Sequence, residues 1–266
     1  MSASAPYGMM SVSEMTVTAS LGELLSGRTP AIAVSFDDSA ARDDVAAARA
    51  EGLDVAELRI DRYSSYDRDY VREHVRLFSS FPTIGTIRRQ DEGGGWSGTE
   101  ADRLAMFKTI LPDVHGIDIE LAASSILPEV VAAAHDARKI VLISNHNFEF
   151  TPSLDELEAM AGRAKELGAD LVKISTMAHS HADAQTLATF TLRNQDKGLI
   201  VIAMGGHGVV SRVFFPALGS RLTYASTPQH TVSGQLSYAE TFQMLRRFYP
   251  EFNQKKVIEL GLMEGA

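Results

Sequence analysis

The chain has 266 residues, 45% of them hydrophobic, so it is long enough to bury the core of one α/β barrel or of two small domains. Its 34 acidic residues outnumber 25 lysines and arginines, and the formal charge of −9 argues against a nucleic-acid or anionic-membrane partner. The absence of cysteine excludes disulfides, thiolate zinc sites, iron–sulfur clusters and cysteine nucleophiles. We therefore expect a single domain with a small-molecule site.

The start of the chain does not read as a targeting segment. Residues 1–14 lack the basic and then apolar order of a signal peptide, and no run of about 18 apolar residues occurs anywhere. We expect a cytoplasmic protein with a loose tail over residues 1–14 and one catalytic domain over residues 15–266.

From Ala31 onward, short β-branched runs alternate with segments of helical periodicity. The expected strands cover residues 31–36, 55–61, 83–88, 116–121, 140–144, 170–176, 199–204 and 222–226. The expected helices cover residues 43–51, 67–80, 100–111, 128–137, 153–167, 182–195, 209–218 and 238–248. Eight strands alternating with eight helices favour a (β/α)8 TIM barrel over an open doubly wound sheet. Residues 16–18, together with the first strand, predict a short N-terminal β-hairpin.

Charged and apolar residues alternate along two of these strands, ELRID at residues 57–61 and IDIEL at residues 117–121. On a barrel strand one parity faces the helices and the other faces the axis, so the charged set is expected to converge inside. The same rule directs Arg88, His146 and Lys173 inward. Charges at the carboxyl ends of barrel strands mark the usual position of an active site.

Lys173 stands at the centre of an apolar strand that also holds Val172 and Ile174. Burial and neighbouring cations lower the pKa of a lysine towards the neutral, nucleophilic amine. Lys173 is therefore a candidate Schiff-base lysine. The alternative is a salt-bridged lysine at a strand end or on an edge strand.

His146 ends the strand before that of Lys173, in the run SNHNF. Neighbouring strands lie about 4.8 Å apart, so the two side chains could act on one substrate. The alternative is a structural histidine. Structural ion pairs are likewise the alternative for Glu57 with Arg59, and for Arg88 with Glu92.

Two further motifs allow simpler interpretations. His179 and His181 resemble part of a metal site, but no third ligand of evident spacing is near, so no metal is expected. The run GGHG at residues 205–208 follows the seventh strand, where many barrels bind phosphate, and Arg212 follows one turn later. Arg212 suggests a site for a phosphate or a carboxylate. A plain tight turn is the alternative.

Taken together, these motifs resemble the type I 3-dehydroquinate dehydratases of the shikimate pathway over most of the chain. The matching segments are ELRID at 57–61, Arg88 with EGG at 92–94, SNHNF at 144–148 with Thr151 and Pro152, GAD to Lys173 at 168–173, Met204 and Gly205 with Gly208, Ser211 and Arg212, and Gly234 with Gln235. The resemblance implies a (β/α)8 barrel, no metal or organic cofactor, and a homodimer.

The resemblance also implies roles in the dehydration of 3-dehydroquinate to 3-dehydroshikimate. Lys173 would form an imine with the C3 ketone, His146 would be the general acid and base, and Glu92 would orient His146. Arg212 would bind the substrate carboxylate. The substrate's ring would be held by residues spread over the other segments, namely Glu57, Arg59, Arg88, Thr231 and Gln235.

The chain departs from the family pattern at two places. Asn147 stands where the family usually has aspartate, and Ser233 stands where the family's closing loop usually has proline. Two rival functions remain open, a class I aldolase-like enzyme that also forms an imine and a catalytically inactive small-molecule-binding homologue. The sequence does not distinguish a role in aromatic biosynthesis from one in quinate breakdown.

Overall fold

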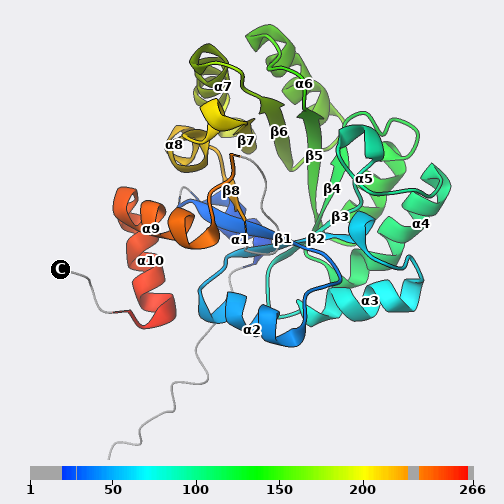
Figure 1. Ribbon diagram of the computed structural model, residues 1–266. Helices are drawn as coiled ribbons and strands as arrows, with labels where there is room; N and C mark the ends of the chain where they lie inside the picture. Colours follow the sequence, from blue (N-terminus) through cyan, green and yellow to red (C-terminus); the bar gives the residue numbers. More distant parts are fainter. Residues whose placement is uncertain (1–19, 28, 227–233, 263–266) are drawn as a thin grey trace, which may run out of the picture.

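The computed structural model describes residues 20–27, 29–226 and 234–262. Its eight strands form one parallel sheet in the order β7-β6-β5-β4-β3-β2-β1-β8 (Figure 1). They are β1 (Ala31–Phe36), β2 (Val55–Arg59), β3 (Thr83–Thr86), β4 (Gly116–Glu120), β5 (Ile140–Asn147), β6 (Leu171–Met177), β7 (Leu199–Met204) and β8 (Leu222–Ala225). Just before β8, Ser220 bridges to Leu199 at the start of β7, so the sheet curls into a nearly closed barrel. The predicted (β/α)8 fold is confirmed.

Helices surround the barrel (Figure 1). They are α1 (Leu21–Ser26), α2 (Arg42–Ala50), α3 (Arg68–Leu77), α4 (Glu100–Ile110), α5 (Leu127–Asp136), α6 (Leu154–Glu166), α7 (His181–Arg193), α8 (Ser211–Leu218), α9 (Tyr238–Phe248) and α10 (Pro250–Leu260). Helices α2 to α9 each follow a strand, whereas α1 precedes β1 and α10 follows α9. Capping boxes fix the first turns of α4, α6, α7 and α9, where a Ser or Thr N-cap pairs with an acidic residue three positions later. None of the helices among the described residues is long and apolar enough to cross a membrane.

Two apolar clusters follow the predicted strand parity. The larger cluster lies between the sheet and the helices and includes Leu58, Ile117, Ile119 and Ile174. The smaller cluster fills the barrel interior with residues of the other parity, among them Val55, Leu171 and Tyr224. Glu57 and Lys173 share the parity of Val55 and Leu171, so the charged set converges inside the barrel as predicted.

Both ends of the described chain carry a helix outside the repeating strand–helix unit. Helix α1 packs Leu21 and Leu25 into the interior cluster, and both edges of β1 pair in parallel, with β2 and β8. The hairpin partner expected at residues 16–18 lies outside the described residues. Helix α10 was not predicted. It docks through the buried Lys256, whose Nζ donates to Asp54 Oδ1 at 2.7 Å and to the Gly52 carbonyl oxygen at 2.7 Å.

Candidate active site

Lys173 lies buried on β6 inside the barrel, with 4% of its surface exposed. Its Nζ donates to Asp118 Oδ2 at 2.9 Å, to Glu57 Oε1 at 3.1 Å and to the Tyr224 hydroxyl at 3.1 Å. These partners come from β4, β2 and β8, so the barrel gathers them from three separate parts of the chain. All three protons of the ammonium are therefore bound.

The predicted direction of the Lys173 pKa is wrong. Burial lowers the pKa of this ammonium, but the negative charges of Asp118 and Glu57 outweigh burial and hold the pKa well above its ordinary value. Burial would conversely raise the pKa of Glu57, and the Lys173 and Arg59 charges overcome it and lower that pKa to about 2. The resting lysine is an ammonium between two carboxylates, not a free amine.

A second arginine of the predicted set, Arg88, is bound inside the same network. Its Nη2 lies 2.8 Å from Asp118 Oδ1, its Nη1 lies 3.3 Å from Glu120 Oε1, and Nη1 also donates to Ser144 Oγ at 2.6 Å. The fully buried Arg103 of α4 holds Glu120 Oε2 from the other side at 2.6 Å. Arg88 therefore fixes Asp118 beside Lys173. The alternative of a structural Arg88–Glu92 ion pair is not what forms.

His146 and Glu92 form the second half of the site. Glu92 Oε2 accepts the backbone N–H of His146 at 2.8 Å and lies 2.9 Å from His146 Nδ1. Burial, together with the positive charges of Arg88 and Lys173, holds the pKa of His146 well below its ordinary value, so the imidazole is neutral. An ionised Glu92 can only accept, so Nδ1 carries the proton and Nε2 is left as a base.

Two glycines follow Glu92, and they allow the turn to pack closely against the Arg88 backbone and the Phe148 ring. Gly93 has a φ of 75°, and a Cβ there would lie 2.7 Å from Cζ of Phe148, whose ring stacks on His146. A Cβ at Gly94 would lie 2.0 Å from the carbonyl oxygen of Arg88. A side chain at Gly94 would displace the turn that presents Glu92 to His146, and a side chain at Gly93 would be strained by the positive φ and would push the Phe148 ring aside.

The Glu92 carboxyl should make folding stability depend on pH. Burial raises its pKa to about 7, against the Arg88 charge, which lowers it. Because the folded pKa exceeds the ordinary value of 4.5, full stability is present below pH 4.5 and is lost as Glu92 ionises up to about pH 7. We expect Glu92→Gln to remove this loss. Between pH 4.5 and about pH 7, the free energy of unfolding of the wild-type protein should therefore fall by about 3 kcal/mol relative to that of the variant.

Urea unfolding of both proteins at pH 4.5 and well above pH 7 measures this difference. Other titrating groups cancel, because they are common to the two proteins. An equal gap between wild type and Glu92→Gln at both pH values would show that Glu92 ionises as it does in solvent.

Arg212 is the remaining predicted charge of the site, and it has no acidic partner in the described part of the chain. The side chain is 5% exposed, its Nε is buried without a hydrogen-bond partner, and burial lowers its pKa to about 10. A buried guanidinium without a counter-charge is costly unless an anion binds there. By contrast, Arg59 forms a two-point pair with Asp61, at 3.0 and 2.8 Å, and not with Glu57.

The segment after β8 lies against the turn that follows β7. Gly234 has a φ of 76°, and a Cβ there would lie 2.8 Å from the carbonyl oxygen of Gly205. Gln235 comes next and is half-buried, so the chain passes close to the turn that leads to Arg212. Thr231 and Ser233 lie outside the described residues.

Sequence reasoning missed Asp118 and Tyr224 as partners of Lys173. The parity rule placed Asp118 and Glu120 inside the barrel but gave them no role. Tyr224 shares the inward parity of Leu222, so the same rule applied to β8 would have found it. The register pairs Lys173 with Ser144, which places His146 two residues further along β5.

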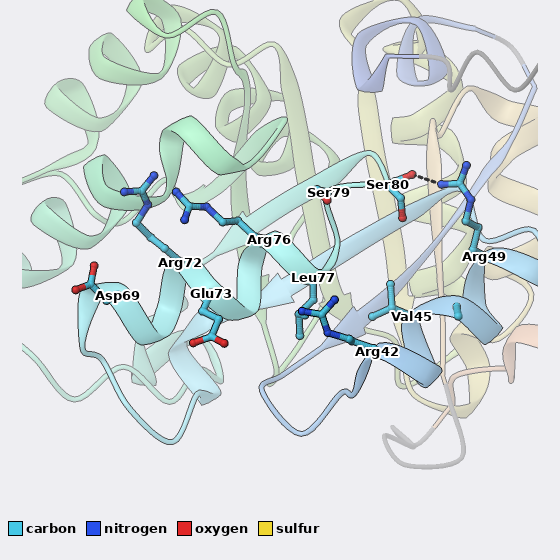
Figure 2. Close-up of a pocket in the computed structure, with 11 residues that line it drawn as sticks. Arg42, Val45, Arg49, Asp69, Arg72, Glu73, Arg76, Leu77, Ser79 and Ser80 are labelled. Atoms are coloured by element: carbon cyan, nitrogen blue, oxygen red, sulfur yellow. Dashed lines mark hydrogen bonds between the residues drawn. The ribbon is translucent and has the colours of Figure 1, made fainter. Parts of the chain in front are cut away.

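A groove of about 740 Å³ between α2 and α3 contains none of the predicted site residues, although four arginines line it (Figure 2). Arg72 and Arg76 both donate through Nε to Asp113, at 2.7 and 3.0 Å, and Arg49 donates to the Ser80 carbonyl oxygen at 2.6 Å. Figure 2 shows the guanidinium of Arg49 at the opposite end of the groove from those of Arg72 and Arg76. The groove therefore does not focus its positive charge on one point.

The two histidines considered for a metal site belong to the β6–α7 connection and the first turn of α7. His179 Nε2 lies 2.7 Å from the carbonyl oxygen of Glu149. Across the ranges that the structure describes, no three His, Asp or Glu side chains gather in a way that could hold a metal ion.

Residues 31–250 match the family described as type I 3-dehydroquinase. The chain belongs to this family. Among its relatives, the 3-dehydroquinate dehydratase of Methanococcoides burtonii is 32% identical, over 78% of this chain and 89% of its own length. That of Thermodesulfovibrio yellowstonii is 33% identical, over 80% of this chain and 93% of its own length.

Solved structures of 3-dehydroquinate dehydratases share the barrel. The Aquifex aeolicus VF5 enzyme superposes with a TM-score of 0.75 at 30% identity, covering 82% of this chain and 99% of that one. The type I enzyme of Clostridium difficile, solved with covalently modified comenic acid, also has a TM-score of 0.75, at 29% identity, and covers 84% of this chain and 93% of its own. The family identified from the sequence motifs is thus the one that the comparisons find.

Proposed function

We propose that this chain dehydrates 3-dehydroquinate to 3-dehydroshikimate through an imine on Lys173. The observation that carries the proposal is a buried lysine on β6 beside the neutral His146 of β5, whose Nδ1 lies 2.9 Å from Glu92 in the turn after β3, in a member of the type I family. The chemistry needs an amine that adds to a ketone and a base nearby that removes a proton from the adjacent carbon.

The steps use groups of this chain alone. Lys173 Nζ, once it has lost a proton, adds to C3, and loss of water leaves a cationic imine. The imine acidifies the C2 proton, which His146 Nε2 removes while the C2–H electron pair forms the C2=C3 bond and the π pair of C=N⁺ moves onto nitrogen. The resulting enamine expels the C1 hydroxyl, which takes the proton from His146 and leaves as water. Hydrolysis of the imine then releases the conjugated product and restores Lys173.

The contacts of the buried side chains support a different division of the binding roles that the resemblance implies. Arg212, buried and without an acidic partner in the described residues, fits the substrate carboxylate. Glu57 and Arg88 are bound to Lys173 and to Asp118, so we assign them to holding the lysine and not the ring hydroxyls. The ring hydroxyls are left to Arg59, Gln235 and Thr231.

An ultraviolet assay tests this proposal. The product is a conjugated enone and the substrate is not, so absorbance should rise when the protein is mixed with 3-dehydroquinate. A class I aldolase-like enzyme would cleave a carbon–carbon bond instead, and an inactive homologue would bind without any change in absorbance. Either result would contradict the proposed dehydration.

We also propose that the protein is cytoplasmic, as its sequence predicts, and a homodimer, as the family resemblance implies. Exposed apolar side chains on or next to the adjacent helices α7 and α8 are candidates for that interface: Leu192 of α7 is 53%, Val210 just before α8 53% and Phe214 of α8 51% exposed. Burying such side chains between two copies would be favourable. We expect light scattering to report a dimer for the wild type and a monomer for Phe214→Asp, with Lys139→Asp as the surface-charge control. A monomeric wild type would contradict the proposal.

A further inference from the structure

The side chain of Tyr224 contacts the nitrogen of Lys173 in two ways. Its hydroxyl oxygen lies 3.1 Å from Nζ, and the centre of its ring lies 4.3 Å from the same atom. The side chain is buried in the barrel interior, with 5% of its surface exposed. Tyr224 therefore touches the atom that would react, although the mechanism above gives it no part.

The contact favours one charge state of the lysine. An ammonium has three protons, and the site offers three acceptors, of which Tyr224 is the only neutral one. The hydroxyl can accept from Nζ and donate its own proton to Glu57 Oε1, 3.4 Å away. When the ammonium loses a proton to become the reactive amine, only two protons remain on Nζ. The Tyr224 hydroxyl then either loses its donor or gives up its hydrogen bond to Glu57 in order to donate to the amine.

The other charged groups around Lys173 are already held in place. Asp118 is fixed by Arg88 and Ser144, and Glu57 accepts hydrogen bonds from Ser35 and Thr86. Five titratable groups interact electrostatically with Nζ. They are Glu57 from β2, Arg88 from the segment after β3, Asp118 from β4, His146 from β5 and Tyr224 from β8. Removing the Tyr224 hydroxyl alone would leave the two carboxylates in position and remove one of the three hydrogen-bond acceptors of Nζ.

We propose that the Tyr224 hydroxyl helps to hold Lys173 as an ammonium in the resting site and so raises the pH above which the imine forms. The inference rests on the proposed function, because it concerns the lysine that reacts. Tyr224 thereby sets the fraction of enzyme that is ready to attack the ketone at a given pH.

The test is Tyr224→Phe, which keeps the ring against Nζ and removes only the hydroxyl. Wild type and variant are mixed briefly with 3-dehydroquinate and borohydride over a series of pH values, and the adduct on Lys173 is quantified by mass spectrometry. A hydrogen bond to a charged group corresponds to a shift of about one pH unit, so the midpoint for adduct formation should move down by about that much. Tyr249→Phe is the matched control, because its hydroxyl binds Ala217 and Val213 outside the site, and its midpoint should stay.

Each outcome has a distinct meaning. If the wild type is labelled on Lys173 and Tyr224→Phe keeps the same midpoint or shifts upward, the inference is overturned and the proposed function stands. If the wild type carries no label on Lys173, the proposed function itself is overturned. A second measurement needs no variant. In NMR spectra of the wild-type protein with isotope-labelled lysine, the resonance of Lys173 Nζ should remain that of an ammonium through neutral pH. A change to the resonance of a neutral amine below pH 7 would contradict the inference.

Discussion

Lys173→Met is expected to abolish turnover, by a factor on the order of 10³ or more, because the covalent route to the product disappears with the amine. The variant should also be less stable. Methionine fills a similar volume, but it leaves Glu57 and Asp118 without the cation that lies 3.1 and 2.9 Å from them. Breaking such a buried pair typically costs about 3 kcal/mol or more, and Arg88 at 2.8 Å from Asp118 limits that cost.

The measurement combines steady-state kinetics with urea unfolding. Lys139→Met is the control, since Lys139 lies before β5 and outside the network, and it should leave turnover unchanged. Turnover within tenfold of wild type in a folded Lys173→Met protein would mean that the dehydration does not pass through this lysine.

His146→Ala should slow turnover by about 10² or more while imine formation persists, since general acid–base catalysis contributes on that order. The separation is expected because His146 belongs to the pair with Glu92 and makes no hydrogen bond to Lys173 among the described contacts. Adduct should therefore still form with borohydride and substrate. Glu92→Gln should show a smaller loss, because the base remains but is no longer oriented by a carboxylate.

Rapid-mixing kinetics followed by adduct quantification separates the two steps. Near-normal turnover in His146→Ala would place the base elsewhere. Loss of the adduct in the same variant would mean that His146 acts before the imine forms, which would contradict the order of steps proposed here.

The sequence predicted the barrel because its signals are local. Alternating charged and apolar residues at 57–61 and 117–121 encode which side of a strand faces the axis, and the structure places Glu57 and Asp118 there. The same parity directs His146 of β5 and Lys173 of β6 into the barrel, since the register pairs Lys173 with Ser144 and His146 with Ser175. Helix α10 was missed because it follows the repeating unit and depends on a distant partner, Asp54.

The charge state of Lys173 could not be predicted because it depends on contacts between distant strands. The neighbours of Lys173 along the chain are apolar, and from them alone burial dominates and the pKa should fall. The fold instead brings Glu57 from 116 positions away and Asp118 from 55 positions away. Arg212 shows the converse: its sequence context suggested an anion site, and its burial without an acidic partner in the described residues strengthens that interpretation.

The most direct test of the central claim is to reduce the protein with borohydride in the presence of 3-dehydroquinate and to locate the covalent adduct by mass spectrometry. We expect one adduct per chain, on Lys173, and none when substrate or borohydride is left out. Lys256 serves as an internal control that should carry no adduct. Like Lys173 it is buried and bound to a carboxylate, that of Asp54, but it lies outside the barrel interior. An adduct on Lys139, Lys165 or Lys256, or no adduct while the enone still forms, would contradict the claim that the reaction passes through an imine on Lys173.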